Sequence, residues 1–334
     1  MGPRLLGKQH PLLVVVWVND AVRVITGLLT GATVSALVGL ATWLPAAASP
    51  SAGPRSGATA SSRGSGGPAG TYVVSAAAQR SALAFWTAPR MTAATGVGRS
   101  ARASARPDVP GTLIAPRGTP TAAKFTGVAT VGALFYTTGS EIHFCTASVV
   151  DSAPRDIVLT AAHCVYSASY ATNLAYVPEY HAGTRPLGTW PVRAITVAAG
   201  WRTTHNPDLD FAFLATAPRD GKYVQTVTGG LHLGRGSAYA QSINVIGYND
   251  TDDLPVRCQT RSFEFRPGQQ EFYCHDYHGG TSGGPWITNL NPRTGTGVVH
   301  GVIGGYEQGG DYEWASYSAY FGAQLDALYK EAAG

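Results

Sequence analysis

Short apolar segments separated by turn residues recur along the chain from residue 125 onward. Their β-branched and aromatic side chains favour strands. Regular short strands without long helices between them are typical of an all-β sandwich or barrel. The segments predicted as strands are 131–137, 143–150, 156–165, 191–197, 211–215, 243–248, 257–265, 284–288 and 298–306.

The end of the chain has a different period. Its apolar and aromatic positions repeat at three- and four-residue steps, which is the spacing of one helical face. We therefore expect a terminal helix packed on the β core. The residues on that face are Tyr320, Phe321, Gln324, Leu325, Leu328 and Tyr329.

Before residue 125 the pattern is weak. Residues 49–70 (SPSAGPRSGATASSRGSGGPAG) cannot bury enough apolar surface to fold. Residues 71–124 contain a weakly patterned stretch around Phe85 and Trp86, and then a run rich in Gly, Arg and Pro. A propeptide or flexible leader fits residues 49–124 better than a second domain. We expect one folded domain, residues 125–334, of about 200 residues.

Residues 1–48 have the layout of a secretory signal. Arg4, Lys8 and Arg23 precede an uncharged apolar stretch at 24–44, and PAAASP follows at 45–50. Signal peptidase accepts only small side chains before the cut, so we expect cleavage after Ala48. The alternative is a retained membrane anchor, because about 20 apolar residues can span a bilayer. With cleavage, the protein is secreted and meets the membrane only transiently.

The charge of the chain adds little to this picture. The net charge of +4 is small, and the arginines before residue 125 are scattered rather than clustered with aromatic residues. This distribution does not support a nucleic-acid partner.

We expect a monomer that uses no cofactor.

All four cysteines, Cys145, Cys164, Cys258 and Cys274, lie in the predicted domain. An even count behind a secretory signal favours two disulfides, and four cysteines allow three pairings. Pairing of neighbours along the chain would close loops of moderate length. The alternative is a zinc site built from Cys258, Cys274, His275 and His278, whose ligand types suit zinc. The spacing of these residues and the secretory context favour a disulfide.

Three segments carry candidate chemistry. The first, LTAAHC (159–164), places His163 at the end of an apolar strand. The second, DLDFAFL (208–214), has two aspartates before a strand of apolar residues. The third, GGTSGGP (279–285), has glycines on both sides of Ser282. A serine hydroxyl attacks a carbonyl only if an imidazole accepts its proton, and a buried carboxylate holds that imidazole in one tautomer. Each segment alone has an ordinary structural explanation, but the chain order His, Asp, Ser matches one known form of this triad. The N–H groups of Gly280 and Ser282 can form an oxyanion hole, because glycines permit the backbone angles it needs.

TAAHC and GGTSGGP resemble the His loop and the Ser loop of the chymotrypsin-like (trypsin-fold) serine peptidases, and DFAFL resembles the family's aspartate with its apolar strand. The resemblance spans residues 125–334. The long leader and the Thr before the serine are most similar to the bacterial V8-like and actinobacterial secreted trypsin-like peptidases. It implies two six-stranded antiparallel β-barrels and a secreted endopeptidase that takes protein or peptide substrates. It also implies that His163, Asp210 and Ser282 form the triad. Cys145–Cys164 resembles the family's bridge beside the His loop, and Asp208, behind Pro207, fits a turn better than the triad.

The sequence departs from the family pattern before the serine. Animal members carry there an aspartate that pairs with a newly cut N-terminus, whereas this chain has Thr281. We therefore expect a site that forms without a charge-paired switch, and a leader that acts by folding assistance or steric cover.

Specificity is predicted less directly. Asp276 stands six residues before Ser282, where trypsin-like members bind basic side chains; the alternative is a solvated loop acid. Ile303 occupies the position at which V8-like members carry a histidine, which argues against glutamate preference. Gly304, Gly305 and Tyr306 are predicted to offer an open edge to a substrate strand.

Two other classes of function remain as alternatives. The first is a catalytically silent binding module on the same fold, because fold alone does not assure activity. The presence of all three triad positions argues against it. The second is an esterase with a serine elbow, which would place Ser, Asp and His in that order along the chain. Here His163 comes first, and the alternating strand–helix pattern of esterases is missing.

Overall fold

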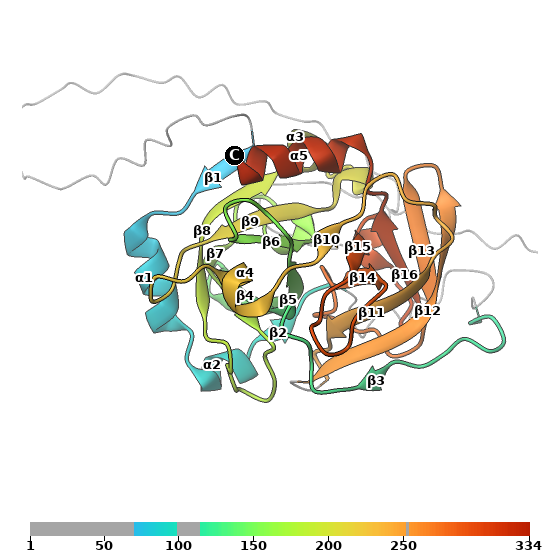
Figure 1. Cartoon of the computed structure of the whole chain (residues 1–334), viewed down its shortest axis with the longest axis horizontal. Coiled ribbons are helices and arrows are strands. Elements are labelled where there is room, and N and C mark those ends of the chain that lie inside the picture. The colour runs from blue at the N-terminus through green and yellow to red at the C-terminus, as the bar shows by residue number, and fades with distance from the viewer. Residues whose placement is uncertain (1–69, 99–113, 252–253) are drawn as a thin grey trace, which may run out of the picture. The chain divides into compact units, whose positions relative to one another are not determined.

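The computed structural model describes residues 70–98, 114–251 and 254–334 (Figure 1). The predicted signal peptide, its cleavage after Ala48 and residues 49–69 lie outside these ranges. No helix within the described residues is long and apolar enough to cross a membrane.

Six antiparallel strands form the first half of the fold. Their order is β8-β7-β4-β5-β6-β9, and β9 pairs again with β8, so the sheet closes into a barrel (Figure 1). Most residues along these strands are buried on both faces, which explains their nearly continuous apolar runs. The strands are β4 (Val131–Thr138), β5 (Glu141–Val149), β6 (Ile157–Thr160), β7 (Thr172–Pro178), β8 (Trp190–Val197) and β9 (Ala212–Thr216).

The second half is a sheet in the order β15-β14-β11-β12-β13-β16. No strand ladder joins β15 to β16 in the described chain, but the N–H of Gly304, just after β15, donates to the carbonyl of Tyr317 in β16. The short strands β10 (His232–Leu233) and β3 (Ala123–Lys124) pair with β15 and β12. The other strands are β11 (Ser242–Tyr248), β12 (Pro255–Arg266), β13 (Gln269–Tyr273), β14 (Pro285–Thr288), β15 (Val298–Val302) and β16 (Ala315–Ala319).

The predicted all-β fold is confirmed: the first sheet is a closed barrel, and the second curls until its end strands meet at one backbone hydrogen bond. The predicted terminal helix is α5 (Ala323–Ala333), which buries Leu325 and Leu328. Two short helices, α3 (Ala199–Thr204) and α4 (Val224–Thr228), lie between strands.

Among the six main strands of each sheet, β7, β13 and β16 were not predicted, and neither were the short strands β3 and β10. In β13 and β16 polar side chains occupy the core, since Gln269, Gln270, Ser316 and Ser318 are almost fully buried. Hydropathy reveals such strands poorly, because polar residues share their buried positions with apolar ones such as Phe272 and Ala319. The predicted strand 156–165 was too long, since β6 ends at Thr160 and the chain turns through the short helix η2 (Ala162–Cys164).

Residues 70–98, which were predicted to belong to a leader, form secondary structure against the first barrel. β1 (Thr71–Val73) pairs with β8, and β2 (Thr95–Gly96) pairs in parallel with β5 (Figure 1). Between them lie α1 (Ala76–Phe85) and α2 (Ala88–Thr92). Trp86 and Met91 are each only 1% exposed and belong to the main core cluster. A few widely spaced apolar residues give no periodic signal, yet Trp86 and Met91 are buried in the core of the folded chain.

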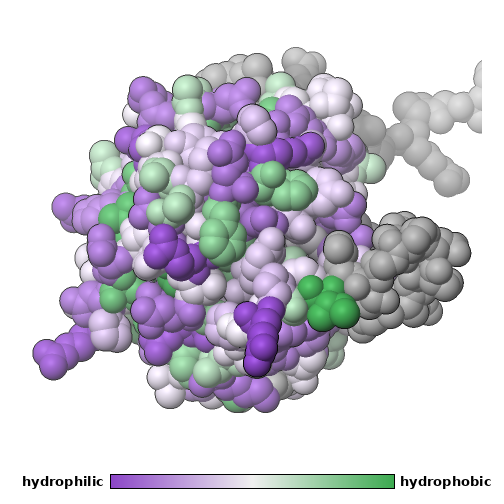
Figure 2. Space-filling view, turned by 90° about the vertical axis from the view of Figure 1, so that its right-hand side faces the viewer, coloured by the Kyte–Doolittle hydropathy of each residue, from purple (hydrophilic) through white to green (hydrophobic). Residues whose placement is uncertain are grey.

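Both pairings of neighbouring cysteines are present as disulfides, Cys145–Cys164 and Cys258–Cys274. Each lies within one half of the fold, since Cys145 belongs to β5 and Cys258 to β12. On the face drawn in Figure 2, hydrophobic residues are scattered among polar ones rather than gathered in one broad patch.

Candidate active site

His163 lies in the tight turn that follows β6. Its imidazole is 2% exposed, and the rings of His163 and Trp201 are 6.5 Å apart. The next residue, Cys164, is bonded to Cys145 of β5, so the turn is covalently held against the barrel wall. This arrangement orders the imidazole before any ligand binds.

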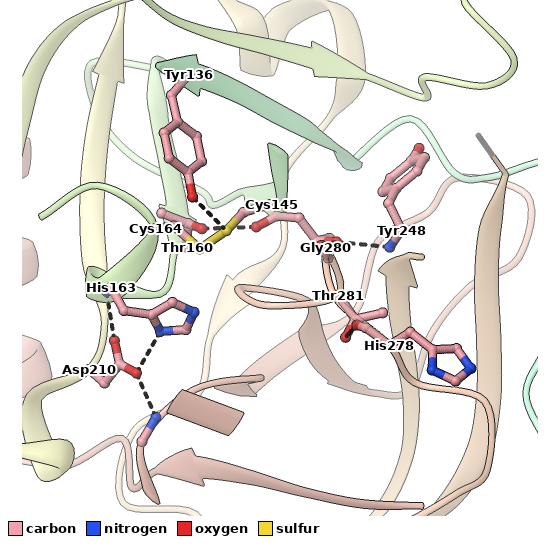
Figure 3. Close-up of a disulfide and its surroundings, with 12 residues drawn as sticks. Tyr136, Cys145, Thr160, His163, Cys164, Asp210, Tyr248, His278, Gly280 and Thr281 are labelled. Atoms are coloured by element: carbon pink, nitrogen blue, oxygen red, sulfur yellow. Dashed lines mark hydrogen bonds and ion pairs between the residues drawn. A yellow bond between two sulfur atoms is a disulfide. The ribbon is translucent and has the colours of Figure 1, made fainter. Parts of the chain in front are cut away.

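Asp210 lies between the short helix η3 (Pro207–Leu209) and β9, and its side chain is fully buried. Its Oδ1 accepts from the backbone N–H of His163 at 2.9 Å, and its Oδ2 lies 2.8 Å from His163 Nδ1 (Figure 3). Oδ2 also accepts from the N–H of Gly305 at 2.8 Å. An ionised carboxylate can only accept hydrogen bonds, so Nδ1 of His163 carries the proton and Nε2 is an acceptor. Nε2 is buried and has no hydrogen-bond partner among the described residues, Ser282 included.

Asp208, the competing acid, occupies a different environment. Its Oδ1 accepts from Nε2 of Gln269 at 2.8 Å and lies 3.9 Å from a guanidinium nitrogen of Arg266. Its side chain is 40% exposed, whereas that of Asp210 is not exposed at all. The structure therefore brings Asp210, and not Asp208, to the imidazole.

The backbone around Ser282 is held from both halves of the fold. The carbonyl of Ser282 accepts from the N–H of Thr146 in β5 at 2.8 Å, and the N–H of Gly283 donates to Ile303 after β15 at 2.7 Å. Gly283 has φ of 80°, and a Cβ there would collide with the carbonyl of Thr146 and the hydroxyl of Thr160. Glycine at this position is therefore required by both the backbone angle and the close packing.

Gly280 is placed by two buried threonines. The hydroxyl of Thr146 donates to the carbonyl of Gly280 at 2.9 Å and accepts from the N–H of Tyr248 at 2.9 Å. The hydroxyl of Thr160 donates to the carbonyl of Thr146 at 2.8 Å. The N–H of Gly280 donates to the carbonyl of Val97 at 2.8 Å. Neither threonine was predicted from the sequence, although a hydroxyl residue in a segment predicted to be a strand was a signal that could have indicated each of them.

Thr281 closes the loop before the nucleophile through its own hydroxyl, which donates to the carbonyl of His278 at 2.7 Å (Figure 3). The N–H of Gly284 donates to the carbonyl of Thr281 at 2.9 Å. Neither contact involves a charge, so this loop is closed without an ion pair at position 281.

The predicted donor edge at residues 304–306 is occupied internally. The N–H groups of Gly304, Gly305 and Tyr306 donate to Tyr317, Asp210 and Gln269 respectively. These three groups therefore offer no free N–H to a substrate strand in this structure. These N–H groups instead hold the carboxylate of Asp210, the middle of β16 and the side chain of Gln269.

Asp276 lies in a loop rich in titratable groups. Its Oδ1 is 3.0 Å from Nε2 of His278, and its backbone N–H donates to Glu313, which also contacts His275. Burial raises the pKa of the nearby Asp250 above its usual range, and the charge of His278 partly counteracts this. The carboxylate of Asp276 is thus paired with a neighbour and 40% exposed.

The zinc alternative does not fit this geometry. Cys258 and Cys274 are bonded to each other, so neither supplies a thiolate to His275 or His278. Cys145, His163 and Cys164 also lie close together, but the two cysteines are bonded to each other as the Cys145–Cys164 disulfide.

Comparison with known proteins identifies the family. The family model for trypsin matches residues 121–322, which is more than half of the chain. The chain therefore belongs to the trypsin family, and it is a serine endopeptidase of the chymotrypsin-like fold. A search of curated protein sequences returned no match.

Solved structures agree with this assignment. The protease Anisep from Arthrobacter nicotinovorans is 27% identical, with a TM-score of 0.58 over 64% of this chain and 99% of its own. The thermostable serine protease AL20 from an extremophilic microorganism is 24% identical, with a TM-score of 0.55 over 61% of this chain and 97% of its own. A Glu endopeptidase is 18% identical, with a TM-score of 0.51 over 64% and 97% of the two chains. The last two likenesses concern the fold alone.

Proposed function

We propose that this endopeptidase cleaves peptide bonds through an acyl-enzyme on Ser282, with His163 as the base and Asp210 as the orienting acid. The observation that carries the proposal is the set of hydrogen bonds from His163 and Gly305 to the buried Asp210 carboxylate. It leaves Nε2 of His163 as a buried acceptor without a partner, which is the atom that must take the serine proton.

The chemical steps follow from this tautomer. Nε2 of His163 takes the proton of Ser282 as Oγ forms a bond to the carbonyl carbon. The negative oxygen that results accepts hydrogen bonds from the N–H groups of Gly280 and Ser282. When the C–N bond breaks, the imidazolium returns its proton to the leaving amine. Water then attacks the acyl group with His163 again as base, and Ser282 recovers its proton.

Ser282 and His163 share no hydrogen bond in the described chain, and this does not count against their roles. Hydrogen bonds between catalytic groups are often loose in a resting enzyme and tighten in the Michaelis complex. Both groups are already fixed by neighbours that do not depend on substrate, namely the disulfide beside His163 and the two sheets around Ser282.

We also propose that the protein is secreted as a monomer after removal of residues 1–48. Two disulfides suit an oxidising compartment, and the small residues before Ser49 suit signal peptidase. Residues 49–124 would then form the leader of the secreted chain. N-terminal sequencing of the secreted protein tests this, and a mature N-terminus upstream of residue 49 would refute it.

A fluorophosphonate probe tests the mechanism directly, because it forms a covalent bond only with an activated serine. We expect one adduct on the folded chain, located on Ser282 by peptide mapping, and none on Ser282→Ala. A silent binding module predicts no adduct. Absence of the adduct from every folded form of the chain, including the variants described below, would refute the proposal.

The predicted role of Asp276 in binding a basic side chain is tested with matched peptide substrates. Asp276→Asn should lower kcat/KM for substrates with Arg before the scissile bond and leave those with Ala unchanged. A parallel decrease for both substrates would assign Asp276 to the structure of its loop instead.

A further inference from the structure

The leader reaches the active site at the edge of β5. β6 pairs only with Ser148 and Val149 of β5, and the N–H of Thr146 bonds to Ser282, so β6 leaves the edge of β5 open before Thr146. β2 fills this edge, with Thr95 opposite His143 and Gly96 opposite Phe144. The N–H of Val97 extends the pairing by donating to the carbonyl of Phe144 at 3.1 Å. Addition of an extended strand to a free edge is also a common way for a protein to bind a peptide.

Val97 uses the same donor that the proposed reaction requires. Its carbonyl accepts from the N–H of Gly280 at 2.8 Å, which is good hydrogen-bond geometry. Gly280 and Ser282 are the proposed donors to the negative oxygen of the reaction. A substrate carbonyl cannot occupy this donor while Val97 does.

Two glycines permit the close approach. A Cβ on Gly98, whose φ is 107°, would collide with Oγ of Ser282. A Cβ on Gly96 would collide with the backbone of Gly279 and Gly280. The backbone of residues 95–98 therefore lies directly against the nucleophile and its oxyanion loop. At Gly96 the clash is with backbone atoms, so no side chain larger than hydrogen fits there in the docked arrangement, and at Gly98 the φ of 107° also disfavours any other residue.

The rest of the described leader anchors this strand from a distance. Trp86 and Met91 are buried in the main core, and Trp86 packs against Phe135 with ring centroids 5.3 Å apart. β1 adds a ladder to β8. These contacts hold residues 95–98 near the site at a high effective concentration, so a short strand suffices to occupy it.

We propose that residues 95–98, which we call the leader strand, are an internal inhibitor that covers the active site and occupies the oxyanion donor of Gly280. This inference rests on the proposed roles of Ser282 and Gly280. It also accounts for the lack of a hydrogen bond between Nε2 of His163 and Ser282, because Gly98 lies against Oγ of Ser282. The leader strand must leave β5 before a peptide can bind.

Gly96→Ala in the full chain tests the proposal. Position 96 does not have a left-handed φ, so alanine there avoids that source of backbone strain, and its nearest clashes in the docked arrangement are with the backbone of residues 279–280. Val97→Pro is an independent second variant, because it removes the N–H that donates to Phe144. Gly322→Ala is the matched control, since Gly322 also lacks a left-handed φ and a Cβ there would make only ordinary contact with the ring of Tyr320.

The readout is the rate of fluorophosphonate modification of Ser282, followed by intact mass, together with hydrolysis of a small peptide ester. Intact mass also shows whether the chain has been cut. We expect Gly96→Ala and Val97→Pro to react at least about tenfold faster than the uncut wild type, because a docked strand lowers the fraction of competent enzyme. Gly322→Ala should react at the wild-type rate.

The three outcomes separate the two proposals. Equal rates for wild type and both folded variants would overturn the inhibitor and leave the catalytic mechanism intact. Absence of an adduct from all four proteins would overturn the catalytic mechanism, and the inhibitor with it. Faster reaction of the Gly322→Ala control to the same extent would show a general loosening of the chain and would also overturn the inhibitor.

Discussion

Asp210→Asn replaces one carboxylate oxygen of the buried acid in the proposed triad by an NH₂ group. In the structure that carboxylate accepts from the N–H of His163, from Nδ1 of His163 and from the N–H of Gly305. An amide has only one acceptor oxygen, so an NH₂ group must face at least one of these donors. The imidazole can relieve the conflict by moving its proton to Nε2, and it then no longer accepts the proton of Ser282.

The expected loss is large. The wrong tautomer in such a triad lowers kcat by about 10⁴, which corresponds to roughly 5.5 kcal/mol of transition-state free energy. Stability should fall as well, since each lost hydrogen bond to a charged group costs about 1.5–3 kcal/mol. KM should change little, because the carboxylate does not contact substrate in the proposed mechanism.

Peptide ester hydrolysis by wild type and Asp210→Asn should be compared in the Gly96→Ala background, and urea unfolding should accompany it. Asp208→Asn is the matched control, because it makes the same chemical change on an acid that contacts Gln269 and Arg266. We expect it to retain activity within about threefold, as for a half-exposed ion pair. Retention of more than about a tenth of kcat by Asp210→Asn would refute the reasoning. Catalysis would then not require the tautomer of His163 that the carboxylate holds.

Three further predictions concern residues around the site and the core. Thr146→Val should lower kcat with little change in KM, because it removes the hydroxyl that bonds to the buried carbonyl of Gly280 and the N–H of Tyr248. It should also lower the free energy of unfolding by about 1–3 kcal/mol for each backbone group left unpaired. Thr146→Ser should restore kcat and stability, and failure of that rescue would show that the methyl group matters instead. Replacing both Cys258 and Cys274 by Ser should lower the free energy of unfolding by about 3 kcal/mol in denaturant titrations, as expected for a separation of 16 residues, whereas an unchanged midpoint would contradict the disulfide. Burial lowers the pKa of His300 to about 4, below its unfolded value of about 6.5. Between these two pH values the unfolded chain binds a proton that the folded chain does not. The free energy of unfolding should therefore fall by up to about 3 kcal/mol as the pH falls from about 6.5 to 4. His300→Gln should flatten the dependence of unfolding free energy on pH in that window, and an unchanged slope would exclude His300 as its source.

Most strands with buried apolar residues could be predicted from the sequence, because period and composition there follow from burial. β7 was missed although Leu174, Tyr176 and Val177 are buried in it. β13 and β16 could not be predicted, since Gln269, Gln270, Ser316 and Ser318 are buried polar residues, and the amides of Gln269 and Gln270 donate to groups far away in the chain. The three segments LTAAHC, DLDFAFL and GGTSGGP could be recognised because the proposed chemistry needs those residue types in those local contexts.

The sequence by itself determined the all-β class, the candidate residues His163, Asp210 and Ser282, and the uncharged position Thr281. Only the tertiary structure decided that Asp210 rather than Asp208 faces His163, that Thr146 and Thr160 hold the loop before Ser282, and that the leader strand lies on Gly280. The physical reason is the range of each interaction. Strand patterns and loop motifs are local in the chain, whereas the contacts of Asp210, Thr146 and Val97 join segments that are brought together only when the two sheets close around the site.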